Sequence, residues 1–106
     1  MRPCRKFQPR PYLIPMEKIR CEIYVTGRVQ GVWFRKSACA EAVRLSISGF
    51  AQNLADGGVR IEAEGSAEDV VRFVAWCRKG PPMAEVERVE VREAAPVGHR
   101  SFIVRH

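Results

Sequence analysis

The sequence predicts an α+β fold in which a four-stranded antiparallel sheet is covered on one face by two helices. In four segments apolar and polar residues alternate, which is typical of strands with one buried face. In two other segments apolar residues recur three and four positions apart, which is typical of amphipathic helices. Because the order is strand, helix, strand, strand, helix, strand, one layer of sheet and one layer of helices can bury both apolar faces.

The first half of the chain supplies a strand, a helix and a second strand. Residues 19–26 alternate, with Ile19, Cys21, Ile23 and Val25 expected on the buried face. Residues 34–45 are expected to be helical, with a core-facing stripe of Phe34, Ala38, Ala42 and Leu45 that Cys39 and Val43 widen. Residues 47–53 form the second strand. Ser46 follows the helix, where a side chain is less comfortable than glycine at positive φ, so we expect a weakened cap.

The second half adds a hairpin, a helix and the last strand. A turn rich in Asn, Asp and Gly, from Asn53 to Gly58, leads to a strand at residues 59–64. The outward side chains of that strand are expected to be Arg60, Glu62 and Glu64. The second helix is expected between Ser66, as N-cap, and Gly80, with a core stripe of Val70, Phe73, Val74 and Cys77. Residues 86–93 form the fourth strand, with Val89 and Val91 inward, and residues 102–104 add a short edge piece. With right-handed crossovers this order gives the ferredoxin-like βαββαβ sandwich.

A glycine-bracketed loop separates the first strand from the first helix. Gly27 and Gly31 lie four positions apart and allow successive backbone N–H groups to turn toward one centre, which favours an anion. The helix that follows adds the positive end of its dipole. Arg35, in the first turn, opposes that dipole unless a bound anion offsets the cost. We expect an anion site here; the alternative is a tight strand-to-helix turn followed by a surface arginine.

The length of the chain and the distribution of its charge predict a single domain that does not bind nucleic acid. The 106 residues make one domain, and residues 1–18 hold +4 of the net charge of +6. Four prolines exclude a continuous helix there, so we expect residues 1–18 to form a disordered basic tail before a domain at residues 19–106. Met16 as the true initiator is the alternative. The domain is nearly balanced in charge and lacks the aromatic pattern of an RNA-recognition domain, so no nucleic-acid partner is expected.

The sequence also lacks the features of membrane-spanning, secreted and metal-binding proteins. There is no apolar run of about 18 residues and no secretory signal pattern, so we expect a cytoplasmic protein that does not bind membranes. The four cysteines show no CxxC spacing and there are two histidines, so we expect reduced thiols and no metal site.

Two stretches resemble the signatures of the acylphosphatase family, whose members hydrolyse the mixed anhydride of a carboxylic acid and phosphate. The first is Gly27-Arg28-Val29-Gln30-Gly31-Val32-Trp33-Phe34-Arg35, and the second is Gly49-Phe50-Ala51-Gln52-Asn53-Leu54-Ala55-Asp56-Gly57. The resemblance extends over residues 19–105. It implies the same ferredoxin-like fold. A related domain also opens larger carbamoyltransferases of hydrogenase maturation, but we expect a free-standing, monomeric enzyme here.

The resemblance also implies a site. Arg35 matches the family's catalytic arginine, which grips phosphate oxygens, and Asn53 matches the catalytic asparagine, which orients the attacking water. The phosphate is expected to bind the backbone N–H groups of a loop made of Gly27, Arg28, Val29, Gln30, Gly31 and Val32. Trp33 is expected at the entrance, where it can contact the acyl group. The substrate is a small-molecule acyl phosphate, and carbamoyl phosphate, 1,3-bisphosphoglycerate and aspartyl phosphates all stay open.

A site with so few functional side chains is sufficient for the hydrolysis of an acyl phosphate. The leaving group is a carboxylate, a weak base that departs without a general acid, so holding the phosphoryl group and placing one water are sufficient. Neither task calls for a metal or a cofactor. The alternative is a regulatory module that binds phosphate on the same fold without catalysis, and Asn53 is the residue that discriminates the two.

Overall fold

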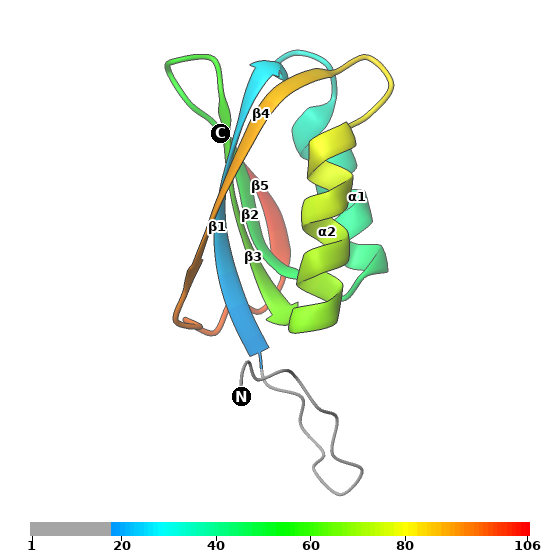
Figure 1. The fold of residues 1–106 in the computed structure, drawn as a ribbon. Helices are drawn as coiled ribbons and strands as arrows, with labels where there is room; N and C mark the ends of the chain where they lie inside the picture. The colour runs from blue at the N-terminus through cyan, green and yellow to red at the C-terminus, as the bar shows by residue number, and fades with distance from the viewer. Residues whose placement is uncertain (1–17) are drawn as a thin grey trace, which may run out of the picture.

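The computed structural model describes residues 18–106, which form a five-stranded sheet with two helices on one face (Figure 1). The strand order is β4-β1-β3-β2-β5. The strands are β1 (Lys18–Arg28), β2 (Ser48–Asn53), β3 (Val59–Ser66), β4 (Glu85–Ala94) and β5 (Phe102–Arg105), and the helices are α1 (Phe34–Arg44) and α2 (Ala67–Lys79). The predicted fold class is confirmed, with one difference. The edge piece is a fifth strand that pairs parallel to β2, so the sheet is mixed.

Helix α2 begins and ends where its capping residues predict. The Ser66 hydroxyl accepts a hydrogen bond from the Asp69 amide at 3.3 Å, and the acidic residues of the first turn complement the helix dipole. Gly80 has a φ of +72° and donates its amide to the Trp76 carbonyl at 2.7 Å. A Cβ at Gly80 would lie 2.9 Å from the Phe34 ring, so glycine also allows the two helices to pack closely.

The core lies between the helices and the sheet. Its largest fully buried side chains are Phe34, Phe73, Ile23, Ile61, Val25, Val29, Val59, Val70 and Cys77. The three cysteines among the described residues are free thiols, two of them buried. Burial raises the pKa of the Cys77 thiol, which keeps it protonated and apolar.

Two predicted core positions are wrong. Val43 is 67% exposed, because the buried side of α1 is a narrow stripe of Phe34, Ala38 and Ala42. Val91 is 40% exposed although it pairs with the buried Ile23 and therefore shares its face. The cause is its position on β4, an edge strand of the sheet.

The sheet face opposite the helices is partly covered, which the sequence did not predict. Glu62 and Glu64 on β3 do not reach solvent but are buried. Glu64 accepts hydrogen bonds from the backbone amides of residues 97–99, and His99 bonds to Glu62 at 2.9 Å. The segment between β4 and β5 therefore crosses this face and hides both carboxylates from water.

The described residues begin at Lys18, the first residue of β1. The expected basic tail ended at Lys18, which instead belongs to this strand. The rest of that expectation, and the one for Met16, fall on residues outside the described part of the chain.

Candidate active site

Three segments meet at one end of the molecule: the loop after β1, the turn after β2 and the C-terminus (Figure 1). They enclose a hollow of about 460 Å³. Both Arg35 and Asn53 line it, so the structure brings together the two residues that the sequence singled out. The other lining residues are Val29, Gly31, Trp33, Phe34, Lys36, Val104 and His106. None of these has an acidic side chain, whereas Arg35 and Lys36 are cationic, so the side chains around the hollow favour an anion.

The loop presents unpaired backbone donors. Among residues 18–106 no hydrogen bond is donated by the backbone amides of residues 31–36, which form the end of the loop and the first turn of α1. Gly31 has a φ of +75° and Trp33 a φ of +66°, so the chain turns twice through left-handed conformations here. Free N–H groups, a local left-handed turn and a helix N-terminus are the components of an anion-binding nest.

Trp33 adopts its positive φ at a cost, since a bulky residue is disfavoured in this region. Trp33 is 69% exposed beside the hollow, and the Lys36 ammonium lies 5.3 Å from its ring centroid. Of the neighbouring aromatic residues Trp33 and Phe34, only Phe34 is buried. The structure therefore places Trp33 at the rim of the hollow, as the sequence predicted.

The loop after β1 begins later than expected. Strand β1 continues through Arg28, and Gly27 is paired with Val86 of β4 at an irregularity in the register. Gly27 has a φ of +124°, and a Cβ there would lie 2.2 Å from the Glu85 carbonyl oxygen. The glycine therefore allows close strand approach. Neither Gly27 nor Arg28 lines the hollow; of the remaining loop positions, Val29 and Gly31 do, whereas Gln30 and Val32 do not.

Arg35 is held by the far end of the chain. Its Nη1 donates to the backbone carbonyl of Arg105, the last residue of β5. No acidic residue stands in the first turn of α1, so a carboxylate on that turn does not compete for the guanidinium. The rest of the fork has the planar geometry that suits two oxygens of a phosphate.

Asn53 ends β2 and pairs with Val59 across the hairpin. The turn that follows closes on itself, with the Leu54 amide bonded to the Gly58 carbonyl at 2.9 Å and the Gly57 amide to the Leu54 carbonyl at 3.1 Å. Asp56 accepts a hydrogen bond from Tyr24 on β1 at 2.5 Å, which holds the turn against the sheet. That hydrogen bond lowers the pKa of Asp56 and raises the pKa of Tyr24.

The side chain of Gln30 joins the two halves of the site. Its Nε2 donates to the Leu54 carbonyl at 2.7 Å and to the Gly58 carbonyl at 2.9 Å. From the sequence, Gln30 was expected to contribute only its backbone N–H group. No local pattern reveals these bonds, because their acceptors lie 24 and 28 positions away.

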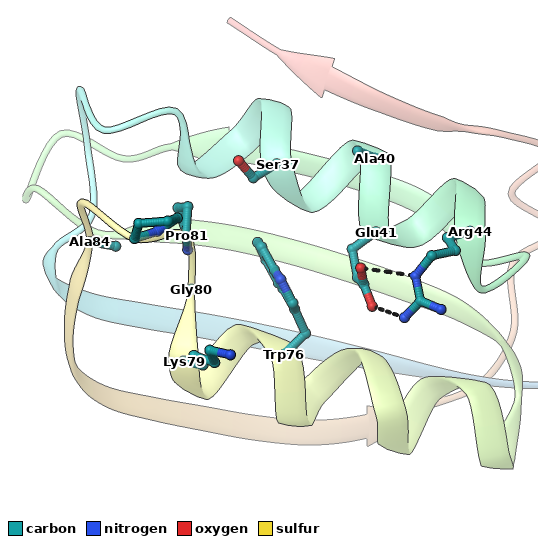
Figure 2. Close-up of a pocket in the computed structure, with 10 residues that line it drawn as sticks. Ser37, Ala40, Glu41, Arg44, Trp76, Lys79, Gly80, Pro81 and Ala84 are labelled. Atoms are coloured by element: carbon teal, nitrogen blue, oxygen red, sulfur yellow. Dashed lines mark hydrogen bonds and ion pairs between the residues drawn. The ribbon is translucent and has the colours of Figure 1, made fainter.

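A second hollow, of about 750 Å³, lies between the outer sides of the two helices (Figure 2). The Trp76 ring rises from α2 toward α1, and Glu41 pairs with Arg44 at one end. Neither Arg35 nor Asn53 lines it. It is a groove of the helical layer, separate from the site.

Within residues 18–106 no three His, Cys, Asp or Glu side chains are grouped so that they could hold a metal ion. No helix in this range has both the length and the apolar character needed to cross a bilayer.

Known proteins resemble this chain over most of its length. The acylphosphatase family model matches residues 21–104. The acylphosphatase of Methylococcus capsulatus is 51% identical over 79 residues, 74% of this chain and 86% of that protein, and the one from Rubrobacter xylanophilus is 52% identical over 87 residues, 81% and 79% of the two chains. The structure of acylphosphatase from Bacillus subtilis superposes with a TM-score of 0.80 at 35% identity and covers 83% of this chain and 99% of its own. The chain belongs to the acylphosphatase family.

Proposed function

We propose that this protein hydrolyses acyl phosphates to a carboxylate and inorganic phosphate in the hollow that contains Arg35 and Asn53. The strongest support comes from the groups that line this hollow. A loop with unpaired amides, a guanidinium and a side-chain amide all face one space that no acidic residue lines. The family membership of the chain supports the same reaction.

The loop and Arg35 bind the phosphoryl group. Backbone N–H groups at the start of α1 donate to its oxygens, and the helix dipole adds to their attraction. Arg35 contributes charge-assisted hydrogen bonds, which are about twice as strong as neutral ones. These donors are fixed before the substrate arrives, so they stabilise the charge that the equatorial oxygens carry in the transition state. Within the loop, Gly31 and the residues after it are the donors best placed, whereas Gly27 and Arg28 lie in β1 and do not line the hollow.

Asn53 orients the attacking water. Its side-chain carbonyl accepts a hydrogen bond from the water, whose oxygen attacks phosphorus opposite the leaving group. The bond between phosphorus and the acyl oxygen breaks, and its electron pair leaves with the carboxylate. The proton of the water passes to the phosphate product or to solvent. Because the carboxylate is a weak base, no side chain has to protonate it.

The proposal also covers the cellular location, the oligomeric state and the cofactor requirement of the protein. We place the enzyme in the cytoplasm, as a monomer acting without a metal or other cofactor. The free thiols among the described residues support a reducing compartment, because disulfides are rare there. Gel filtration with light scattering tests the oligomeric state.

Hydrolysis of benzoyl phosphate with chelator present tests the reaction. The wild type is expected to consume the substrate, and Asn53→Ala to show no hydrolysis above background. Gln52→Ala is the matched control, because successive side chains of a strand point to opposite faces, and it should retain activity. A folded wild type that binds phosphate without hydrolysing benzoyl phosphate would instead be a regulatory module.

Oxygen-18 water tests the site of attack. Attack at phosphorus puts the label in phosphate. A label found in benzoate would mean attack at the carbonyl carbon and would contradict the role given to Asn53.

A further inference from the structure

The two catalytic groups lie on different segments, and something must fix the distance between them. Arg35 and the free amides belong to the end of the loop and the first turn of α1, whereas Asn53 belongs to the hairpin of β2 and β3. An in-line attack requires the water held by Asn53 to lie on the axis of the breaking bond. A displacement of about 1 Å between reacting groups can cost on the order of 100-fold in rate.

The Gln30 side chain is the described contact that spans this gap. It comes from the loop, and both hydrogens of its amide are used, one on the Leu54 carbonyl and one on the Gly58 carbonyl. The opposite orientation of the amide would set its oxygen against two carbonyl oxygens, so the acceptors fix which atom faces the turn. Leu54 follows Asn53 directly, and Gly58 precedes Val59, the partner of Asn53 across the hairpin. The bonds therefore hold both strands of the turn at the level of Asn53.

The turn does not need Gln30 in order to form. Each of the two carbonyls also accepts a backbone hydrogen bond from within the turn. Tyr24 anchors the same turn to β1 through Asp56. Removing the Gln30 amide would leave a formed hairpin whose position relative to the loop is no longer set.

We propose that Gln30 is a positioning residue, whose side chain holds the Asn53 turn against the phosphate loop and thereby sets the place of the attacking water. This inference rests on the proposed function of the site. Gln30 itself does not line the hollow, so its side chain acts through Asn53 and not on the phosphate.

The test compares Gln30→Met with the wild type in benzoyl phosphate hydrolysis and in inhibition by inorganic phosphate. Methionine keeps the length and the neutral charge of the side chain and removes both donors. We expect kcat to fall roughly 10- to 100-fold, as for a misplaced reactive group, while the inhibition constant of phosphate changes less than about threefold. Tyr24→Phe is the control, because it removes a bond to the same turn that does not reach the loop, and both constants should stay within about threefold.

Two outcomes overturn the inference. One is a folded Gln30→Met enzyme with kcat within about threefold of wild type, and the other is a loss of phosphate affinity in proportion to the loss of kcat. If Gln30→Met is not folded at the assay temperature, Gln30→Asn replaces it, since its shorter side chain cannot reach both carbonyls. A failure of the proposed function differs visibly, because it shows in the wild type and in Asn53→Ala. Hydrolysis that is lost in Asn53→Ala but retained in Gln30→Met overturns this inference alone.

Discussion

The guanidinium of Arg35 donates a hydrogen bond to the backbone carbonyl of Arg105, although the two residues are 70 positions apart. This bond joins the first turn of α1 to the end of β5, which pairs parallel to β2. The parallel edge strand β5 therefore helps to form the candidate site. It brings a backbone acceptor to the residue that is expected to grip the substrate.

Deleting residues 105 and 106 should weaken the binding of the substrate phosphate by Arg35. Without the acceptor the guanidinium loses one fixed partner and must be ordered by the substrate, so we expect kcat/KM to fall by about tenfold and phosphate inhibition to weaken with it. Arg105→Ala is the control, because it keeps the carbonyl while removing the guanidinium that lies 3.8 Å from the Phe50 ring centroid. Equal losses in the deletion and in Arg105→Ala would mean that the Arg35 bond is unimportant.

Glu64→Gln should destabilise the fold in a pH-dependent way. Burial raises the pKa of the Glu64 carboxyl, but hydrogen bonds from the amides of Val97, His99 and Gly98 outweigh it and hold the pKa below its ordinary value. A lowered folded-state pKa gives stability that is present above the unfolded pKa of about 4.3 and is lost as the pH falls through the folded value.

Urea unfolding measures this effect. At pH 7 we expect Glu64→Gln to lose about 1.5–3 kcal/mol of unfolding free energy, the range for a hydrogen bond to a charged group. At pH 3 the difference from wild type should shrink. Glu87→Gln, at an exposed position on β4, should be neutral at both values. A loss for Glu64→Gln that is equal at pH 7 and pH 3 would contradict the role of its charge.

Ser46→Gly should stabilise the protein. Ser46 has a φ of +59° at the end of α1, a conformation that glycine adopts without strain. We expect a gain of up to about 1 kcal/mol, which in a domain of this size raises Tm by roughly 4–8 °C. Ser48→Gly, the same change within β2, should instead lower Tm, because glycine weakens a strand. Thermal unfolding followed by circular dichroism tests both signs.

Trp33→Gly should change substrate preference more than stability. The ring is 69% exposed, so little packing is lost, and glycine relieves the positive φ. An aromatic contact contributes about 0.5–1.5 kcal/mol, so KM for benzoyl phosphate should rise roughly two- to tenfold. Acetyl phosphate, which has no ring, is the control substrate and should be affected less. A parallel rise for both substrates would place Trp33 in phosphate binding.

The sequence predicted what depends on local pattern. Alternation and helical spacing fixed the strands and helices to within a residue or two, and Ser66 and Gly80 marked the ends of α2 correctly. The family signatures drew attention to Arg35 and Asn53, and the structure places both in one hollow. Glycine at position 31 was expected to let the backbone amides turn toward one centre, and Gly31 has a φ of +75°.

The sequence did not predict what depends on packing between distant segments. Alternation assigned Glu62 and Glu64 to the outer face, but no local signal shows that residues 95–101 cover that face. The exposure of Val91 follows from the edge position of β4, which is a property of the whole sheet. The bond between Gln30 and the Asn53 turn likewise depends on the distance between two loops, so it is seen only in three dimensions.

In the proposed mechanism, Arg35 binds the phosphate and Asn53 holds the attacking water. Calorimetric titration with inorganic phosphate tests this division most directly when each variant's turnover of benzoyl phosphate is measured alongside. We predict that Asn53→Ala binds phosphate within about threefold of wild type but does not turn over, whereas Arg35→Ala loses both properties. Near-normal turnover in Asn53→Ala, or undiminished phosphate affinity in Arg35→Ala, would contradict the account.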